Sequence, residues 1–407
     1  MAGPQPPRCA PLRTVRALDL FSGVGGLWLG WKAGVEEAGR RFELVGAVDG
    51  DKTLEPAYAL NAPATPFLRY RFSADPGDGQ PRHIAKQLGV EPDDIDVLLA
   101  GPPCQTLSAA GKRQDHPDNW LALRVCDVVE FLRPRVAVIE QVPEFRHLHD
   151  GRLIGRVRVQ LEEAGYATDV QTLNATAFGV PQVRNRCFVF AVRRELLGSR
   201  SMSQLRPTPT HLPVERFGRP PQRLPLPLTG PDVEPPVPPT VADAIDDLPA
   251  LKAGEGEEES VIGAPARTDY QRALRCPEGR LFNHVAARHS PEMVAMLAQM
   301  APGETPQRVP DHPLRRKDYF RSAYARLAPD SVAPTMTTNT HNPGSGRFTH
   351  YRDPRVLTVR EVARLQGFPD CFRFVGDQLY QRRHVGNAVP PILARAIGRG
   401  LLKALDG

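Results

Sequence analysis

The sequence predicts an α/β protein built on a parallel sheet that helices cover on both faces. Within the first 195 residues, short and nearly continuous apolar runs alternate with helix-like segments. Such runs are typical of parallel strands because both faces of each strand are buried. A chain of 407 residues is also long enough to form two or three domains, each with its own core.

The expected elements follow one another in a regular order. The apolar runs that we expect to be strands are residues 15–21, 42–49, 95–100, 136–140 and 187–192. A helical pattern follows the first run over residues 27–33. Residues 390–405 also have helical periodicity, and we expect this last helix to pack back on the first domain.

Proline marks a region of a different kind. Of the 43 prolines in the chain, many lie between Leu205 and Thr240. Because proline fixes φ and removes a backbone donor, this stretch predicts neither a long helix nor a central strand. We interpret residues 200–265 as loops and short elements beside a second domain. For residues 215–238 a disordered spacer is an equal alternative.

Composition excludes several classes of protein. The net charge is +6, no stretch approaches 18 uninterrupted apolar residues, and the N-terminus lacks a charged and then apolar signal. The six cysteines are scattered without a C-x-x-C pair, and the histidines show no H-x-x-x-H spacing. We therefore expect no membrane span, no secretory signal, no disulfide framework and no metal site, and we expect the protein in the cytoplasm.

Polar and reactive residues follow the expected strands. A glycine-rich loop at residues 21–26 follows the first strand, Asp49 ends the second, Cys104 follows the third and Glu140 ends the fourth. Ligands gather at the carboxyl ends of parallel strands, so these residues predict a site at one rim. The loop and Asp49 indicate a nucleoside cofactor, with a structural turn as the alternative. The glycine spacing fits a nicotinamide or flavin enzyme less well.

Three features near this rim suggest chemistry. Cys104 lies on a loop stiffened by two prolines and is a candidate nucleophile, or alternatively a buried thiol. Glu140 faces it as a candidate proton donor, or is simply a solvated strand end. Alternation places Gln182, Arg184 and Arg186 on one face. Such a polar row suits recognition of a base or an anion, and the alternative is an edge strand that faces solvent.

These motifs and their order resemble those of DNA (cytosine-5) methyltransferases of the bacterial restriction–modification type. The matching segments are spread over most of the chain: residues 19–26, 101–105, 140, 182–186, 360–369 and 386–391. The resemblance implies a Rossmann-like S-adenosylmethionine-dependent methyltransferase sheet with a smaller, irregular target recognition domain. The implied parts are a flexible N-terminus (1–14), a catalytic domain (15–195 with 380–407) and the target recognition domain (196–379).

The resemblance also implies roles for individual residues. Cys104 would attack C6 of a flipped-out cytosine in duplex DNA, Glu140 would hold the base, Arg186 would stabilise charge, and Arg184 would orient the base or a phosphate. The implied residues of the S-adenosylmethionine site are Phe21, Gly23, Val24, Gly25, Asp49, Gly50, Asp75, Gly101, Pro103, Leu121, Asn387 and Val389. The implied DNA contacts are Gln182, Arg184 and Ser108.

Further expectations concern partners. We expect double-stranded DNA as substrate, a monomeric enzyme at the bacterial nucleoid, and a restriction endonuclease that acts separately. In the target recognition domain we expect phosphate contacts from arginines and a lysine at positions 267, 272, 275, 280, 288, 308 and 315–317. Asn283, His284 and residues 335–339 are candidates for groove contacts or, equally, for turns.

Three residues or pairs depart from the family pattern. Gln141 replaces the usual asparagine, Gly50 replaces a bulky residue that would cover the adenine, and Thr106-Leu107 follow Gln105. These departures keep two rival hypotheses open. One is a DNA-binding regulator on an inactive methyltransferase scaffold, and the other is an RNA cytosine methyltransferase of the same fold.

Overall fold

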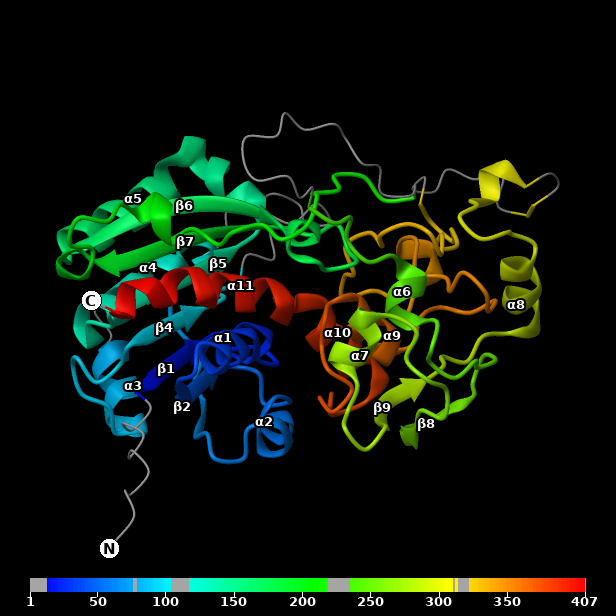
Figure 1. The fold of residues 1–407 in the computed structure, drawn as a ribbon, viewed down its shortest axis with the longest axis horizontal. Helices are drawn as coiled ribbons and strands as arrows, with labels where there is room; N and C mark the ends of the chain where they lie inside the picture. The colour runs from blue at the N-terminus through cyan, green and yellow to red at the C-terminus, as the bar shows by residue number, and fades with distance from the viewer. Residues whose placement is uncertain are drawn as a thin grey trace, which may run out of the picture.

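A computed structural model of the chain describes residues 13–75, 79–103, 117–218, 235–309, 312–313 and 322–406. Cys104, Ser108 and the Thr106-Leu107 pair lie outside these residues, as do positions 315–317. Figure 1 shows two regions: a sheet with its helices, and a second region of short elements beside it. The C-terminal helix returns to the sheet region.

Within the described residues, seven strands form one sheet in the order β3-β2-β1-β4-β5-β7-β6. Their bounds are β1 (Thr14–Leu20), β2 (Arg41–Asp49), β3 (Phe67–Arg69), β4 (Val97–Ala100), β5 (Val136–Gln141), β6 (Tyr166–Asn174) and β7 (Asn185–Arg193). From β3 to β5 all neighbours are parallel. The strand order reverses at β1, between β2 and β4, and this reversal creates the crevice in which such folds bind ligands.

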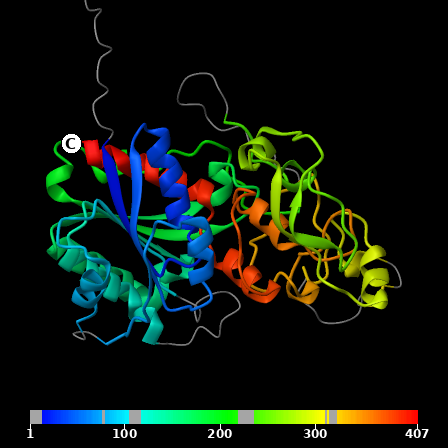
Figure 2. The ribbon, with the colours of Figure 1, turned by 90° about the horizontal axis from the view of Figure 1, so that it is seen from below.

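Helices cover both faces of the sheet (Figure 2). On one face lie α1 (Gly26–Glu37) and α11 (Pro391–Leu402); on the other lie α3 (Gln80–Leu88), α4 (Leu121–Leu132) and α5 (Arg152–Glu163). The strands serve both cores in alternation: Val97 and Leu99 join the first cluster, and Leu98 and Ala100 the second. The short helix α2 (Glu55–Asn61) precedes β3. The prediction of an α/β fold covered on both faces is confirmed.

The prediction that the sheet is wholly parallel is wrong at one edge. Strand β7 runs antiparallel to both β5 and β6. The connection from β6 to β7 is too short for a crossover helix, so the chain turns back beside the strand that it has just left. Strand β6 escaped prediction because its sequence, YATDVQTLN, is partly exposed and mostly polar. Strand β3 escaped because it has only three residues.

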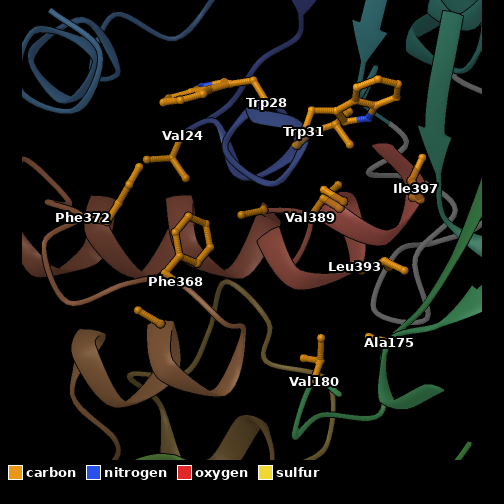
Figure 3. Packing of buried hydrophobic residues seen from close by; sticks show 14 of the residues in the cluster. Val24, Trp28, Trp31, Ala175, Val180, Phe368, Phe372, Val389, Leu393 and Ile397 are labelled. Carbon is orange, nitrogen blue, oxygen red and sulfur yellow. The ribbon is translucent and has the colours of Figure 1, made fainter. Parts of the chain in front are cut away.

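The expected packing of the C-terminal helix on the first domain is confirmed, and glycines allow it. A Cβ at Gly30 would lie 2.1 Å from the Pro391 carbonyl oxygen, and a Cβ at Gly26 equally close to that of Val389. The backbones of α1 and α11 therefore approach closely. Figure 3 shows the tryptophans of α1 and the apolar residues of α11 in one cluster; these are Trp28, Trp31, Leu393 and Ile397.

The second region consists of short elements. They are α6 (Val241–Ile245), β8 (Gly256–Val261), α7 (Asp269–Leu274), β9 (Arg280–Val285), α8 (Pro291–Ala298), α9 (Val359–Leu365) and α10 (Gln378–Asn387). Strands β8 and β9 pair in antiparallel fashion. Buried arginines connect these elements. Arg360 donates to the carbonyls of Phe282, Pro369 and Phe372, and Arg364 pairs with Asp370.

The structure corrects one expectation from cysteine spacing. Cys276 and Cys371 form a disulfide, although 95 residues separate them. The backbone N–H of Asp370 donates to the carbonyl of Leu274 at 2.7 Å, so the fold brings two distant segments side by side. The free thiols among the described residues are Cys126 and Cys187, both buried. Within the part of the chain that is described, no helix has the length and apolar content to cross a membrane.

Candidate active site

The carboxyl ends of β1 and β4 form the centre of the rim. Phe21 leaves β1 with a φ of 51°, and its ring stacks on Phe72 with centroids 4.2 Å apart. The backbone N–H of Ser22 donates to the Val48 carbonyl, and that of Gly101 to the Leu20 carbonyl, both at 3.1 Å. The loops that follow β1 and β4 are thereby attached to the ends of neighbouring strands.

Asp49 holds the glycine loop in place. Its Oδ2 accepts the backbone N–H of Gly23, and its Oδ1 accepts that of Asp51, both at 2.9 Å. Burial raises the pKa of Asp49, and these backbone hydrogen bonds oppose the rise. Gly25 has a φ of 97°, and a Cβ there would lie 2.0 Å from Trp28 Nε1. In this conformation of the loop, a side chain at position 25 would clash with Trp28.

The loop fits a nucleoside-containing cofactor. No described atom lies within 4 Å of a Cβ built at Gly23, so the backbone of the loop is accessible beside the Asp49 carboxylate. Gly50 is exposed, and a Cβ there would meet only ordinary contacts with Arg71 at 3.5 Å. Asp75 is exposed too, and its backbone N–H donates to Ser73 Oγ at 3.1 Å. The Asp49 carboxylate thus lies next to open backbone.

Glu140 and Arg186 form an ion pair at the same rim. Arg186 Nε donates to Glu140 Oε1 at 2.8 Å, and the two side chains are 16% and 13% exposed. Burial raises the pKa of Glu140, while Arg186 and Arg184 oppose the rise. A Cβ at Gly101 would lie 3.7 Å from Glu140 Oε2, so the pair borders the loop that leads to Cys104. Cys104 itself lies outside the described residues.

Gln141 supports that loop directly. Its side chain is buried, and its Nε2 donates to the Pro102 carbonyl at 2.8 Å. Its Oε1 is buried and has no hydrogen-bond partner among the described residues. The longer side chain at this position therefore binds the backbone just before Pro103 and Cys104.

Gln182 and Arg184 make hydrogen bonds within the chain and are not open at the rim. Both are fully buried. The Gln182 side chain bonds to the backbones of Leu365 and Met336, and Arg184 donates to the carbonyls of Met336, Gly386 and Ala388. The predicted common face of residues 182–186 is interrupted, because only Arg186 reaches the rim. The two inner side chains instead attach the segment before β7 to the second region and to the end of α10.

The segment after α10 closes the site beside the glycine loop. Asn387 is exposed at the end of α10, and Val389 is buried with its carbonyl oxygen against Gly26. Gln366 donates to the Val385 carbonyl, and Arg184 donates to the Gly386 carbonyl, so both side chains bind the last turn of α10. Of the other predicted residues, Val24 and Leu121 are buried in the two cores, and Pro103 is half-buried at the edge of the described loop.

Several predicted DNA contacts are engaged elsewhere. Ion pairs hold four arginines of the second region: Arg267 with Asp246, Arg272 with Asp269, Arg275 with Asp247, and Arg280 with Glu259. Asn283 and His284 lie within strand β9 and not in a turn, and both are buried and hydrogen-bonded. No group of three or more potential metal ligands occurs among the described residues.

Sequence reasoning missed a buried polar group below the glycine loop. Asp19 is buried, and its pKa is raised first by burial and then by Asp49. Nearby, Trp28 Nε1 donates to the Tyr58 hydroxyl at 3.2 Å. Sequence reasoning also missed His384, which contacts Thr53. Asp19 was visible as the acid before the glycine loop, but no spacing in the sequence connects Thr53 with a histidine more than 300 residues away.

Comparison with known proteins gives a consistent result. The sequence profile of C-5 cytosine-specific DNA methylases matches residues 15–403. The type II methyltransferase M.AgeI of Thalassovita gelatinovora is 30% identical over 96% of this chain and 100% of its own. M.XorII of Xanthomonas oryzae, also a type II methyltransferase, is 32% identical over 95% of this chain and 84% of its own.

A solved structure shares the fold. It is a DNA modification methyltransferase encoded within a prophage of E. coli, with a TM-score of 0.72 and 24% sequence identity. The match covers 97% of this chain and 100% of that one. The arrangement of the sheet and of the second region is therefore found in an experimental structure.

Proposed function

Because the chain belongs to the family of C-5 cytosine-specific DNA methylases, it is a DNA (cytosine-5)-methyltransferase, and we propose which residues carry its reaction. Cys104 is the nucleophile, Glu140 and Arg186 act on the base, and the rim around Asp49 holds S-adenosylmethionine. The observation that carries the proposal is the largely but not fully buried Glu140–Arg186 pair, which borders the backbone of the loop leading to Cys104.

The cofactor site is formed by two segments of the chain. Asp49 accepts hydrogen bonds from the ribose hydroxyls, and the open backbone at Gly23 lies along the cofactor. Asn387 and Val389 border it from the other side. When bound, S-adenosylmethionine supplies a methyl group that is activated for transfer by its positive sulfur. Asp75 lies near the adenine, while Gly50 leaves the adenine face without a covering side chain.

The residues at the rim prepare cytosine C5 to accept a methyl group. The Cys104 thiolate forms a bond to C6, and the electrons of the C5–C6 double bond become available at C5. Glu140 in its acid form donates a proton to N3, and Arg186 stabilises negative charge that develops on the ring. After transfer, C5 loses its proton to water, the C6–S bond breaks and N3 returns its proton to Glu140, which restores the aromatic ring, the thiolate and the acid form of Glu140.

The raised pKa of Glu140 suits this role. Burial favours the neutral acid, so a proton is available nearer to neutral pH than on an ordinary glutamate. Arg186 limits the shift and orients the carboxyl group through its Nε hydrogen bond. The same pair therefore orients the donor and provides a positive charge beside the base.

The target cytosine must leave the duplex before this chemistry is possible, because C6 is inaccessible in a stacked base pair. Flipping costs a few kcal/mol. Residues 196–379, as the target recognition domain, supply the DNA contacts that offset this cost. The type II names of the relatives suggest a separate restriction endonuclease as the biological partner.

Labelled methyl transfer tests the proposal. Purified protein is incubated with methyl-labelled S-adenosylmethionine and unmethylated genomic DNA, with Cys104→Ala as the matched variant and structured RNA as the alternative substrate. We expect label on DNA with the wild type only, and base-resolution sequencing should locate it at C5 of cytosine in one sequence context. DNA binding without label would contradict the proposal and favour the inactive-scaffold hypothesis. Label on RNA alone would favour an RNA methyltransferase.

A further inference from the structure

A chain of hydrogen bonds joins the loop after β2 to helix α10. The backbone N–H of Asp51 donates to Asp49 Oδ1 at 2.9 Å. Asp51 Oδ1 accepts the backbone N–H of Thr53 at 2.9 Å and its hydroxyl at 2.6 Å. Thr53 Oγ1 in turn lies 3.0 Å from Nε2 of His384, a residue of α10. The chain therefore starts at the carboxylate beside the glycine loop and ends in the helix that leads to Asn387.

The chemistry of Thr53 determines the direction of the last bond. A threonine hydroxyl has one hydrogen, and this hydrogen is donated to the Asp51 carboxylate at 2.6 Å. Thr53 Oγ1 must therefore accept from His384, which places the imidazole proton on Nε2. His384 Nδ1 is buried without a hydrogen-bond partner among the described residues, and burial lowers the pKa of the ring, with Asp51 opposing. The neutral imidazole is thus a single, directed donor.

The surroundings keep the imidazole in this position. His384 is buried, and its Nε2 lies 3.7 Å from Asp51 Oδ2. The other charged or ring groups nearby are Arg383, whose guanidinium lies 4.0 Å from Asp51, and Tyr380, whose ring centroid is 6.4 Å away. The ring cannot turn into water without breaking the contact with Thr53.

We infer that His384 is a positioning residue for cofactor binding. It fixes the end of α10, and with it Asn387 and Val389, in position relative to Asp49. The inference rests on the proposed function, in which these two segments border S-adenosylmethionine. They are distant in sequence, and the contact of Thr53 with His384 joins them. His384 does not touch the reacting atoms and acts through Thr53 and Asp51.

The structure offers a matched control for this link. Asn61 of α2 also joins the sheet region to the second region: its Nδ2 donates to the Arg373 carbonyl, and its Oδ1 accepts the Arg373 backbone N–H, both at 2.9 Å. Asn61→Ala removes two hydrogen bonds between the same regions but leaves the Asp49–Asp51–Thr53 loop untouched. A general loosening of the two regions would therefore appear in this variant as well.

The test compares His384→Leu, His384→Gln, Thr53→Val and Asn61→Ala in the full chain. Calorimetry with S-adenosylhomocysteine gives Kd, and steady-state methyl transfer gives kcat and KM for S-adenosylmethionine. Loss of one directed hydrogen bond should raise Kd and KM by about five- to tenfold in His384→Leu and Thr53→Val, with kcat within about twofold of wild type. The double variant His384→Leu/Thr53→Val should bind no more weakly than Thr53→Val alone, because Thr53→Val already removes the bond that His384→Leu would break, together with the Thr53 hydroxyl bond to Asp51.

Two further results complete the test. His384→Gln should restore affinity to within about twofold of wild type, since its amide N–H reaches the same acceptor. Asn61→Ala should keep wild-type affinity while lowering the melting temperature. Normal affinity in Thr53→Val, or an equal loss in Asn61→Ala, would overturn the inference and leave the proposed function standing. No binding by the wild-type chain would instead overturn the cofactor assignment, and the inference with it.

Discussion

The sheet region and the second region are stabilised by different kinds of interaction. In the sheet region, apolar strands such as β4 and β5 are buried between two layers of helices, and each strand contributes to both cores. In the second region, four of the largest fully buried side chains are arginines: Arg355, Arg360, Arg364 and Arg382. They donate to carboxylates and to backbone carbonyls of distant segments.

The residues expected to react and the charged residues that stabilise the fold therefore lie in different regions. The reactive groups lie at the rim of an apolar scaffold that does not depend on them, whereas the second region depends on its charges to connect short elements. A buried charge pair is costly to break because the remaining partner is left in a medium that solvates it poorly. Substitutions at the rim should therefore change rates, and substitutions of the buried arginines should change stability.

The largest expected effect is on the rate, at Glu140. Glu140→Gln removes the proton donor but keeps the size of the side chain, and we expect single-turnover methyl transfer to slow by about 10²- to 10⁴-fold. The wild-type rate should fall as rising pH deprotonates Glu140, whose pKa burial raises, and the variant should lack this decline, as rapid-quench assays across pH would show. The Glu140–Arg186 pair is partly exposed, and a glutamine oxygen can still accept the Arg186 hydrogen bond, so urea unfolding should stay close to wild type. A large loss of stability would contradict the view that reacting and stabilising groups lie in different regions.

The next effect is on stability, at Arg364. Arg364→Met leaves the buried Asp370 carboxylate without its main partner, and we expect a loss of about 3–5 kcal/mol in the free energy of unfolding. The double variant Arg364→Met/Asp370→Leu should recover much of the loss, because an apolar pair replaces the ionic one. Urea titration measures both.

Arg158 of α5 is the matched control for this prediction. It pairs with Glu162 on the surface of the sheet region, and Arg158→Ala should cost less than about 1 kcal/mol. Equal losses at Arg364 and Arg158 would show that burial of the charge does not matter.

A pH effect should follow from His350 in the second region. Its Nδ1 accepts the backbone N–H groups of Arg352 and Asp353, and Glu361 Oε1 lies 3.7 Å from its Nε2. Burial lowers the pKa of His350 from 6.5 to about 4, with Glu361 opposing. Between these values the unfolded state binds more protons, so stability should fall as pH falls, by up to about 1.4 kcal/mol per pH unit.

His350→Asn tests this origin. Asparagine keeps an acceptor near the Nδ1 position but does not titrate, so its melting temperature should change less between pH 6.5 and 4.5 than that of the wild type. Parallel pH curves for the two proteins would mean that other groups cause the acid sensitivity.

The smallest predicted effect distinguishes a supporting residue from a reacting one. Gln141→Asn shortens the side chain by one methylene and should lose the hydrogen bond to the Pro102 carbonyl. We expect methyl transfer to slow by about fivefold, with affinity for S-adenosylhomocysteine unchanged. A rate equal to or above wild type in single-turnover assays would show that Gln141 is a tolerated replacement without a role in the loop.

The two regions also differ in how far sequence predicts them. Apolar runs revealed the strands β1, β2, β4 and β5, because burial on both faces leaves a local signal in the sequence. The apolar run at residues 187–192 also revealed β7 but not its antiparallel direction, and the edge strands β3 and β6 left a weaker signal, because length and direction depend on tertiary pairing. In the second region the decisive contacts join residues far apart, and no local pattern reports them.

The site shows the same limit. The motif resemblance predicted Glu140 and Arg186, and the structure brings them together at 2.8 Å. Alternation alone placed Gln182 and Arg184 on the same face as Arg186. The chain is not a regular strand before Asn185, so both side chains turn inward to bond with backbone groups. The role of His384 could not be predicted, because its partner Thr53 lies in another part of the chain.

Trapping the covalent adduct tests the central claim most directly. Duplex DNA in which cytosines carry fluorine at C5 cannot lose a C5 proton after methyl transfer, so the C6–S bond should persist. We predict a denaturation-resistant protein–DNA complex that requires S-adenosylmethionine, with mass spectrometry locating the cytosine on the peptide that contains Cys104. No adduct, or an adduct on another thiol such as Cys187, would contradict the assignment of the nucleophile.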